Sequence, residues 1–589
     1  MKKYVKYFLI LLTICLLFTS CTSAGTPDKK STDSEYSQEV QNLEKLCKVW
    51  GYTKYTHPAF LLGKKDWDEE LLKLIPVVSE AKAKEVNDIL HEWFVSLGEI
   101  DYGTSRKKTL PPEDKLIVQA DTSWISDKKY LGTKLIEDFA QIGDIPSVNR
   151  NQAPVSFKAN GVPQFVKEER YQEMDYKDLS YRLLGLFRFW NAVEYYSPYL
   201  DIMDKNWELL LPDYIQKMIN VDDKTGYELT ILSLAVKMND AHTFLLNGET
   251  DIFSLGKDDT QKRLLTGEFG DHFLPVKLIT VEDQPVVAAV GTEDCSLMIG
   301  DIILKLNGVD IDEIIQQRKE YIPIPNEEKL ERIYPYLLTS KSKEMEITIL
   351  RNGKEEIVSA TGSIENFSYG YSAPAFREKE DAPYRISKDN IGIINLRNPP
   401  EGGINKMMSD LEKTDGLVID LRKGANLGVD LIYFCQYFCE DYQAAVQLAK
   451  PTKTLPGSYV SDVIMSGSTG SERKISGRYY YPNPVVILTN EMVVSSTEYA
   501  TMLMRAGKNV VVMGGKTLGA DGDVTWLPLP GNLQITFSSL GVYGPNMEQT
   551  QRVGLTPDIE VYPTIEGIKE GRDELMEAAV AYIQEQNEK

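Results

Sequence analysis

The sequence predicts a multidomain α/β protein with helical units in its first half and a strand–helix core at its end. Three observations support this prediction. The chain has 589 residues, enough for roughly three to five domains. A set of unusual residues recurs at a fixed offset in the first half, which is typical of related structural units. From about residue 366 onward, short β-branched runs alternate with helical segments, as in a core with parallel crossovers.

The N-terminus resembles a secretory signal. Two lysines precede an apolar run over 7–18, and Thr19-Ser20-Cys21 follows it. This pattern predicts a lipoprotein signal peptide over 1–21 with Cys21 acylated; the alternative is an ordinary cleaved signal in which Cys21 is lost or free. The run is too short to span a bilayer securely, and no later segment approaches the ~20 apolar residues that a spanning helix needs. We therefore expect an exported protein, anchored to the cell envelope through its N-terminal lipid only.

Charge and cysteine content exclude several function classes. Lys plus Arg number 65 against 87 Asp plus Glu, and a net charge of −22 repels nucleic acid. Six cysteines are too few for a disulfide framework in a chain of this size. Cys435 and Cys439 have the spacing of a metal pair, but their aromatic neighbours favour two core cysteines. Because no His/Asp/Glu cluster has ligand spacing, we expect no metal and no organic cofactor.

The first half contains an internal repeat. Residues 22–40 are polar and indicate a flexible tether, and two helical units follow over 41–150 and 151–267. Five residues of the first unit recur 140 positions later: Trp50, Tyr55, Pro58, Lys65 and Trp67 as Trp190, Tyr195, Pro198, Lys205 and Trp207. The ends of the copies differ, because aligning Asp101 with Asp240 sets Gly103 against His242. Only the second copy has a histidine there.

The second half changes in pattern twice. Over 268–362, short β runs alternate with turns, including Asn352-Gly353, and predict a β domain. Over 363–589 we expect strands at 391–396, 417–421, 485–488 and 510–513, with helices at 404–411, 429–438 and after Ser495.

The most informative segment is the strand-to-helix turn at Ser495. A β-branched run breaks at Asn490, and a helix restarts with Ser495 at its mouth. A serine there lies beside unpaired backbone N–H groups, which stabilise the oxyanion formed when a carbonyl is attacked. The alternative is that Ser495 or Ser496 only caps the helix, with Glu498 completing a capping box.

Four motifs in the second half share one resemblance. They are Gly416-Leu-Val-Ile-Asp-Leu-Arg422, Ser495-Ser-Thr-Glu498, Gly514-Gly-Lys-Thr-Leu-Gly519 and Gly554-Leu-Thr-Pro-Asp-Ile559. In this order they resemble the tail-specific, or carboxyl-terminal processing, serine protease family. The resemblance implies that Ser495 is the nucleophile and that 363–589 form a crotonase-like ββα core with a C-terminal helix. The run 297–308 resembles bacterial PDZ domains, which accept an extended peptide as an added strand.

The general base distinguishes two branches of this family. The processing branch uses a lysine 25 residues after the serine, where this chain has Ala520, and the nearest lysine is Lys516. The tricorn-like branch instead takes a histidine from an earlier helical domain. Of the four histidines, His242 in Asp-Ala-His-Thr best matches that motif, so the resemblance implies a Ser495–His242 dyad.

Two positions depart from the tricorn-like pattern. Ala241 replaces the serine before the histidine, and Gln551 replaces a glutamate three residues before Gly554. Glutamine can orient an imidazole by accepting a hydrogen bond, but it supplies no charge. We therefore expect a carboxylate at 551 to raise activity, and we keep Asp240 and Glu548 as other candidates for orienting His242.

The oxyanion donors complete the expected site. The resemblance implies the N–H of Ser496 and one N–H from the loop 422–426, where we select Gly424.

These features predict a cell-envelope serine endopeptidase that cleaves peptides or unfolded proteins through an acyl-enzyme. The alternative is a catalytically weak member that binds peptides or apolar ligands, favoured by Ala241, Ala520 and Gln551. The sequence leaves the substrate, the cleavage preference, the oligomeric state and the membrane leaflet undetermined.

Overall fold

The computed structural model describes residues 36–103, 112–143, 145–248, 260–291, 295–364, 382–398, 400–425, 430–467 and 479–589. The predicted signal peptide with Cys21 lies outside these residues, as do most of the tether and Asn426 of the expected oxyanion loop. Residues Gln38–Lys589 form one unit of the chain. A helix already begins at Gln38, so it starts inside the predicted tether. Within the described ranges, every helix is too short or too polar to cross a membrane.

The helical half contains two groups of helices that begin in similar ways. The first group comprises α2 (Gln38–Thr56), α3 (Pro58–Leu61), α4 (Trp67–Ser79), α5 (Ala83–Ser96) and α6 (Lys128–Ile142). The second comprises α7 (Leu179–Tyr196), α8 (Trp207–Asn220) and α9 (Lys224–Val236). Short elements join them: η1 (Glu113–Lys115), β1 (Leu116–Val118), η2 (Ser123–Ser126), β2 (Ser156–Phe157), β3 (Pro163–Gln164) and η3 (Leu200–Ile202).

A tryptophan contact is made in the same way in both groups. Trp50 Nε1 donates to Trp67 O at 2.9 Å, and Trp190 Nε1 donates to Trp207 O at 3.2 Å. Each bond joins the first long helix of its group to the start of the next long helix. The buried indole N–H therefore finds its partner by the same geometry in both copies.

Ion pairs between the two groups are reciprocal. Lys48 on α2 pairs with Glu208 on α8 at 3.1 Å, and Arg188 on α7 pairs with Asp68 on α4 at 2.6 Å. Positions 48 and 188, and likewise 68 and 208, differ by the same 140 residues. Such an exchange is the signature of a self-complementary interface, in which each surface contacts its counterpart.

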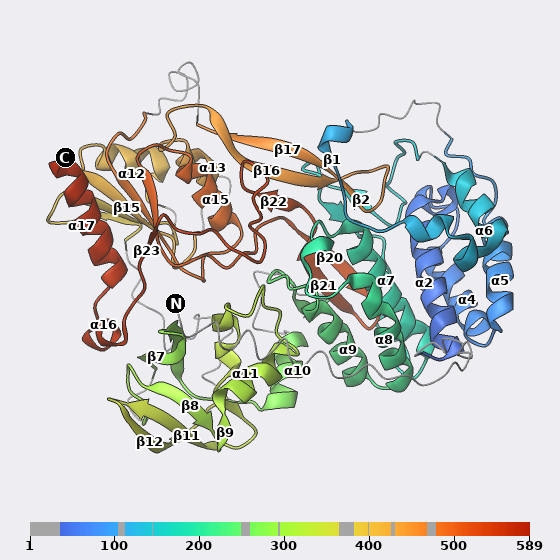
Figure 1. The fold of residues 1–589 in the computed structure, drawn as a ribbon, viewed down its shortest axis with the longest axis horizontal. Helices are drawn as coiled ribbons and strands as arrows, with labels where there is room; N and C mark the ends of the chain where they lie inside the picture. The colour runs from blue at the N-terminus through green and yellow to red at the C-terminus, as the bar shows by residue number, and fades with distance from the viewer. Residues whose placement is uncertain are drawn as a thin grey trace, which may run out of the picture. The chain divides into compact units, whose positions relative to one another are not determined.

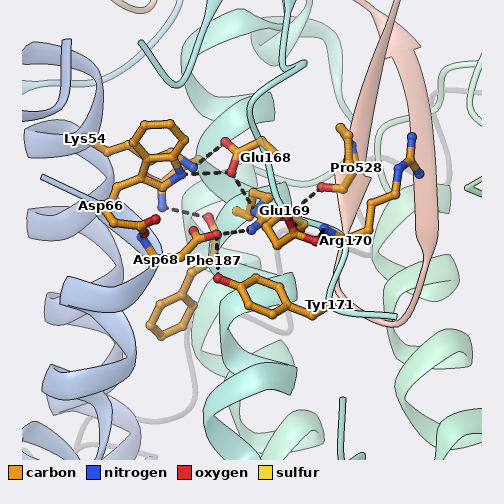
Figure 2. Close-up of polar contacts among 12 residues, drawn as sticks. Lys54, Asp66, Asp68, Glu168, Glu169, Arg170, Tyr171, Phe187 and Pro528 are labelled. Carbon is orange, nitrogen blue, oxygen red and sulfur yellow. Dashed lines mark hydrogen bonds and ion pairs between the residues drawn. The ribbon is translucent and has the colours of Figure 1, made fainter. Parts of the chain in front are cut away.

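Figure 2 shows a buried ion-pair network around Lys54, Asp68 and Glu168. Arg188 contacts Asp68 at 2.6 Å and Glu168 at 2.9 Å, and Lys54 binds Glu168 at 2.6 Å. Arg188 Nη1 also donates to the carbonyl of Pro528 at 2.9 Å. Pro528 belongs to a strand of the C-terminal core. These four charged side chains are at most 3 % exposed. The network therefore joins both helical groups and the core without access to water.

We expect Arg188→Met to lower the free energy of unfolding by about 3–5 kcal/mol, because Asp68 and Glu168 would remain buried without their shared cation. Urea unfolding followed by circular dichroism measures this loss. Lys134→Met is the matched control, since Lys134 and Asp88 form an ion pair that is 62 % and 61 % exposed, and we expect little change there. Equal losses of unfolding free energy in the two variants would contradict a larger contribution from the buried network.

Residues 260–291 and 295–364 form a β domain whose core includes residues of two helices, α10 and α11. Its sheet has the order β12-β11-β8-β7-β6, with antiparallel neighbours. Asn352 and Gly353 have φ of 51° and 75°, so the predicted turn connects β11 to β12. Ile311, Ile314 and Ile315 of α11 belong to its core. Its elements are α10 (Thr260–Phe269), β5 (His272–Phe273), β6 (Val276–Val281), β7 (Gln284–Val290), β8 (Ile302–Leu306), β9 (Val309–Asp310), α11 (Ile311–Lys319), η5 (Leu330–Arg332), η6 (Tyr334–Tyr336), β10 (Thr339–Ser340), β11 (Glu344–Arg351) and β12 (Lys354–Thr361).

The C-terminal core contains a six-stranded sheet in the order β13-β14-β15-β18-β19-β23. Its strands from β14 to β23 run parallel, and β13 is antiparallel. The predicted alternation of strands and helices therefore produces parallel crossovers. The sheet and its helices are β13 (Tyr384–Ile386), β14 (Ile391–Asn395), α12 (Gly403–Leu411), β15 (Gly416–Asp420), α13 (Asp430–Cys435), β18 (Val485–Thr489), α15 (Ser496–Arg505), β19 (Val510–Gly514), β23 (Ile559–Glu560), α16 (Ile565–Glu570) and α17 (Glu574–Glu588).

Helices cover both faces of this sheet (Figure 1). On one face, apolar residues of α12, α13 and α15 pack against Ile394, Ile419 and Ile487. On the other face, α17 packs against alternate residues of the same strands. Strands buried on both faces explain why the sequence shows continuous apolar runs rather than alternation.

Two smaller sheets connect the core to the helical half. One has the order β1-β17-β16-β22, with β16 (Gln443–Pro451), β17 (Ser458–Ser466) and β22 (Gly541–Tyr543). The other has the order β20-β21-β4, with β4 (Leu245–Asn247), β20 (Val524–Leu529) and β21 (Leu533–Ser538). In the second sheet, a strand that follows the second helical group pairs with a hairpin of the core. That pairing positions His242.

Candidate active site

Ser495 lies at the turn between β18 and α15, in a backbone conformation that serine rarely adopts. Its φ is 59° and its ψ is −130°. Positive φ is unfavourable for a side chain with a Cβ, and residues held this way cluster at functional sites. Its N–H donates to Ala520 O at 2.8 Å and lies 3.3 Å from Glu498 Oε2. The turn is therefore fixed by the loop that follows β19.

Glu498 ties that loop to the serine helix. Its buried carboxylate accepts hydrogen bonds from the N–H groups of Gly519 at 2.9 Å and Ala520 at 3.0 Å, and from the hydroxyl of Thr517. Burial raises the pKa of Glu498, and these hydrogen bonds act in the opposite direction. The capping-box acid predicted from sequence thus also organises the glycine-rich loop.

Ala520 occupies the position of the lysine in the processing branch, and it is completely buried. It forms one small cluster with Ala241 and Leu518, against which Val494 packs. The residue before His242 and the residue before Ser495 therefore belong to the same apolar cluster. This packing brings the chain segment of the second helical group to the segment of the serine turn.

Two lysines, Lys516 and Lys329, lie at the glycine-rich loop 514–519. Lys516 is half-buried, and its carbonyl accepts a hydrogen bond from Lys329 Nζ at 3.3 Å. Lys329 precedes η5 of the β domain and is buried. Burial lowers the pKa of Lys329, while Glu491 raises it. Sequence reasoning missed Lys329, because it lies 166 residues before Ser495 in a segment without a motif.

His242 is held by strand pairing between β4 and β21. The ladder joins Leu245 to Ile535, and beyond it Thr536 exchanges hydrogen bonds with Phe244 and donates to His242 O at 2.7 Å. At the end of this pairing, His242 Nδ1 lies 3.1 Å from Ser538 Oγ. Burial lowers the pKa of His242, Asp240 raises it, Arg332 lowers it and Asp523 raises it.

The other three histidines have different partners. His57 is buried, and its Nδ1 accepts the N–H of Ala59 at the start of α3; burial is the main cause that lowers its pKa to about 4. His91 lies 2.6 Å from Asp138 within the helical half. His272 is in β5, opposite Ser340 of β10. None of these contacts involves the serine turn or the glycine-rich loop.

Gln551 reaches this region but has a different partner from the expected one. Its Nε2 donates to Asp240 Oδ1 at 3.1 Å, and its Oε1 accepts the N–H of Asp521 at 3.3 Å. The sequence suggested that Gln551 accepts a hydrogen bond from His242, whereas the structure makes it a donor to Asp240. Glu548, the other acid considered, binds Asn546 instead.

The two expected oxyanion donors differ in their hydrogen bonding. Ser496 is the first residue of α15, where the N–H groups have no partner within the helix. Gly424 has a φ of 82°, and its N–H donates to Leu421 O at 2.9 Å within its own turn. The N–H of Gly424 is therefore already used in this arrangement, contrary to the role expected from the sequence.

The described residues contain no group of three His, Cys, Asp or Glu side chains able to hold a metal ion. Cys435 and Cys439 are both buried, and each sulfur contacts a backbone carbonyl, of Ala500 and Asp441 respectively. Both cysteines therefore behave as core residues here.

A comparison with known protein families gives a match over the segment that contains Ser495. Residues 390–561 match the model of peptidase family S41. A mutant of CPAF is similar in structure, with a TM-score of 0.50 and 11 % identity over 69 % of this chain and 96 % of that chain. At this identity the likeness shows a shared fold. No curated protein matches the chain.

Two further solved structures are similar at lower scores. The photosystem II D1 C-terminal processing protease has a TM-score of 0.36 and 16 % identity over 67 % of this chain and 98 % of that chain. The tricorn protease has a TM-score of 0.35 and 13 % identity over 69 % of this chain and 37 % of that chain.

Proposed function

Because this chain belongs to the tail-specific protease family S41 and is a serine-type peptidase, we propose that Ser495 is its nucleophile and His242 its general base. The observation that carries the proposal is the cluster of Ala241, Ala520 and Val494, which joins the segments of the two residues. The strained backbone at Ser495 supports it further, since strain of this kind exposes a nucleophile at a sharp turn.

The proposed reaction passes through an acyl-enzyme. Ser495 Oγ attacks the substrate carbonyl carbon while its proton passes to His242 Nε2. The tetrahedral oxyanion accepts a hydrogen bond from the N–H of Ser496. The imidazolium then gives the proton to the leaving amine, and an ester to Ser495 remains. Water hydrolyses this ester with His242 again as base, which regenerates the free hydroxyl. Because burial lowers the pKa of His242, the imidazole is neutral and ready to act at neutral pH.

A fluorophosphonate probe tests the proposal directly. It reacts covalently with activated serine hydroxyls, so we expect labelling of a single peptide that contains Ser495, identified by mass spectrometry. Ser539, a buried serine of the same core, provides the internal control and stays unlabelled. Absence of labelling at Ser495 would favour a weak family member that binds peptides or apolar ligands.

Gln551→Glu is expected to lower turnover at neutral pH, the reverse of the effect suggested by the sequence. Gln551 Nε2 donates to Asp240 Oδ1 at 3.1 Å, so glutamate would replace that donor by a second carboxylate and disfavour ionisation of both. We expect kcat/KM to fall about 10-fold at pH 7 and to recover in part on acidification. Measurements of kcat/KM from pH 5 to 9 on an unstructured protein substrate show whether the substitution lowers or raises turnover.

Gln551→Met is the matched control, because it removes the donor without adding charge. Its loss should be smaller and independent of pH. A Gln551→Glu variant that is faster than the parent would restore the interpretation in which residue 551 assists His242 directly.

We also propose that the β domain over 268–362 is PDZ-like, that the core is crotonase-like, and that the β domain holds the tail of the substrate. The antiparallel sheet with α11 packed on it supports this proposal. Peptides with a free or an amidated C-terminus, titrated into Ser495→Ala protein, provide the test. Equal affinities would contradict capture of a C-terminal tail.

The N-terminal pattern supports a proposal about location. We propose that Cys21 is lipidated and anchors the enzyme to the cell envelope. Cys21→Ser should then move the protein from the membrane fraction to the soluble fraction, because a single sequence element provides the anchor. The specific activity of the released enzyme should equal that of the parent. Retention of the variant in membranes would point to an uncleaved signal or a protein partner.

A further inference from the structure

We propose that Ser538 is a positioning residue that connects the carboxylate of Asp240 to His242 and fixes the proton on His242 Nδ1. This inference rests on the proposed function, in which His242 is the general base. Ser538 is the last residue of β21 and lies 296 residues after His242. No sequence motif points to it.

The direction of the hydrogen bonds follows from the donors around Asp240. Its carboxylate accepts the N–H of Ser538 at 2.7 Å, the N–H of His242 at 3.0 Å and the side-chain amide of Gln551 at 3.1 Å. All three groups can only donate, which suits an ionised carboxylate that can only accept. The hydroxyl of Ser538, 3.2 Å from Asp240 Oδ1, must therefore give its proton to this carboxylate.

The same hydroxyl then acts as an acceptor toward His242. A serine hydroxyl has one proton and two lone pairs, and the proton is already directed to Asp240. At 3.1 Å from Ser538 Oγ, His242 Nδ1 must carry a hydrogen and donate it. The neutral imidazole therefore has its lone pair on Nε2, the nitrogen that takes the proton of Ser495 in the proposed reaction.

The relay also compensates for the burial of the base. His242, Asp240 and Ser538 are 6 %, 4 % and 0 % exposed, so water contributes little to stabilising an imidazolium there. When Nε2 is protonated, the hydrogen bond from Nδ1–H to Ser538 Oγ becomes charge-assisted. The hydrogen bond from the Ser538 hydroxyl to Asp240 is then also strengthened, because linked hydrogen bonds polarise one another. The other charged groups that act on His242 are Arg332, which opposes its protonation, and Asp523, which favours it.

This arrangement replaces the expected tricorn-like partners by other positions of the chain. Residue 241 is an alanine packed in an apolar cluster, and residue 551 is a glutamine that donates to Asp240. Neither can join a carboxylate to the imidazole. Asp240 and Ser538 supply an acid and a hydroxyl at the same histidine, which accounts for a competent base despite both replacements.

Ser538→Ala isolates the relay, because the backbone N–H of residue 538 still binds Asp240 and only the hydroxyl bridge is lost. We expect kcat to fall about 10- to 100-fold with KM nearly unchanged. The acid limb of the kcat/KM profile should move to lower pH, because loss of the acceptor disfavours the imidazolium. The rate of fluorophosphonate labelling should fall in parallel.

Three further variants separate positioning from structural damage. Ser538→Thr keeps a hydroxyl and should recover most of kcat. Ser539→Ala removes a neighbouring hydroxyl of equal burial and should leave kcat and the pH profile unchanged. Asp240→Asn should cost little more in the Ser538→Ala background, because both changes break the same relay.

The controls distinguish two kinds of failure. If His242→Ala keeps full activity, the proposed function itself is wrong. If His242→Ala abolishes activity while Ser538→Ala retains the parental kcat and acid limb, the relay alone is wrong. If Ser538→Thr is unstable, additivity of the Asp240→Asn and Ser538→Ala losses would by itself overturn the relay.

Discussion

Replacing Ser495 with alanine is expected to lower kcat by about 10⁴-fold or more while leaving the fold intact. The hydroxyl makes the covalent bond in both halves of the reaction, and losing a nucleophile removes the whole covalent route. Its contribution to folding is small by comparison, since a helix cap stabilises by only ~1 kcal/mol. Steady-state hydrolysis of an unstructured protein substrate, with thermal unfolding of the same preparations, measures both effects.

Ser495→Gly sharpens this experiment. The φ of residue 495 is 59°, where glycine is comfortable and alanine is strained. We therefore expect the glycine variant to be as inactive as the alanine variant but more stable. Parental activity in either variant would remove Ser495 from the mechanism. Equal stability of the two would show that the turn relaxes when the serine is replaced.

Local sequence patterns were sufficient to predict most of the core. The apolar runs of β15 and β18 and the helix after Ser495 depend on residues close together in the chain, so periodicity reveals them. The helix expected over 429–438 is shorter in the structure, where α13 ends at Cys435. Aromatic residues after Cys435 continue the apolar pattern because they enter the core, although the chain no longer forms a helix.

The partners of the general base could not be predicted in the same way. Asp240 and Ser538 are 298 residues apart, and they meet only because β4 pairs with β21 of the core. Spacing from Gly554 pointed to Gln551, which contacts Asp240, but spacing does not determine which of its amide atoms faces which neighbour. The role of Gln551 as a donor to Asp240 follows from the three-dimensional contacts alone.

His242→Ala is expected to lower kcat as much as Ser495→Ala, because nucleophile and base act as one unit and their losses are not additive. The Ser495→Ala/His242→Ala double variant should therefore be no slower than either single variant. His91→Ala is the matched control, since His91 lies on the helical half beside Asp138, and its kcat should equal that of the parent. Lys516→Ala and Lys329→Ala should retain most of the activity.

The pH profile of the parent enzyme gives a second test of the same assignment. A base must be neutral to accept a proton, and burial lowers the pKa of His242 below its ordinary 6.5. The rate kcat/KM should therefore stay on its plateau as pH falls through 6.5 and decline only at more acid pH. The free energy of unfolding also falls below pH 6.5, because His242 binds a proton more readily in the unfolded chain than in the folded protein. Thermal unfolding must therefore be followed at each pH. A lysine base would instead have to be deprotonated to act, so a decline that begins well above pH 7, together with loss of activity in Lys329→Ala, would assign the role to that lysine.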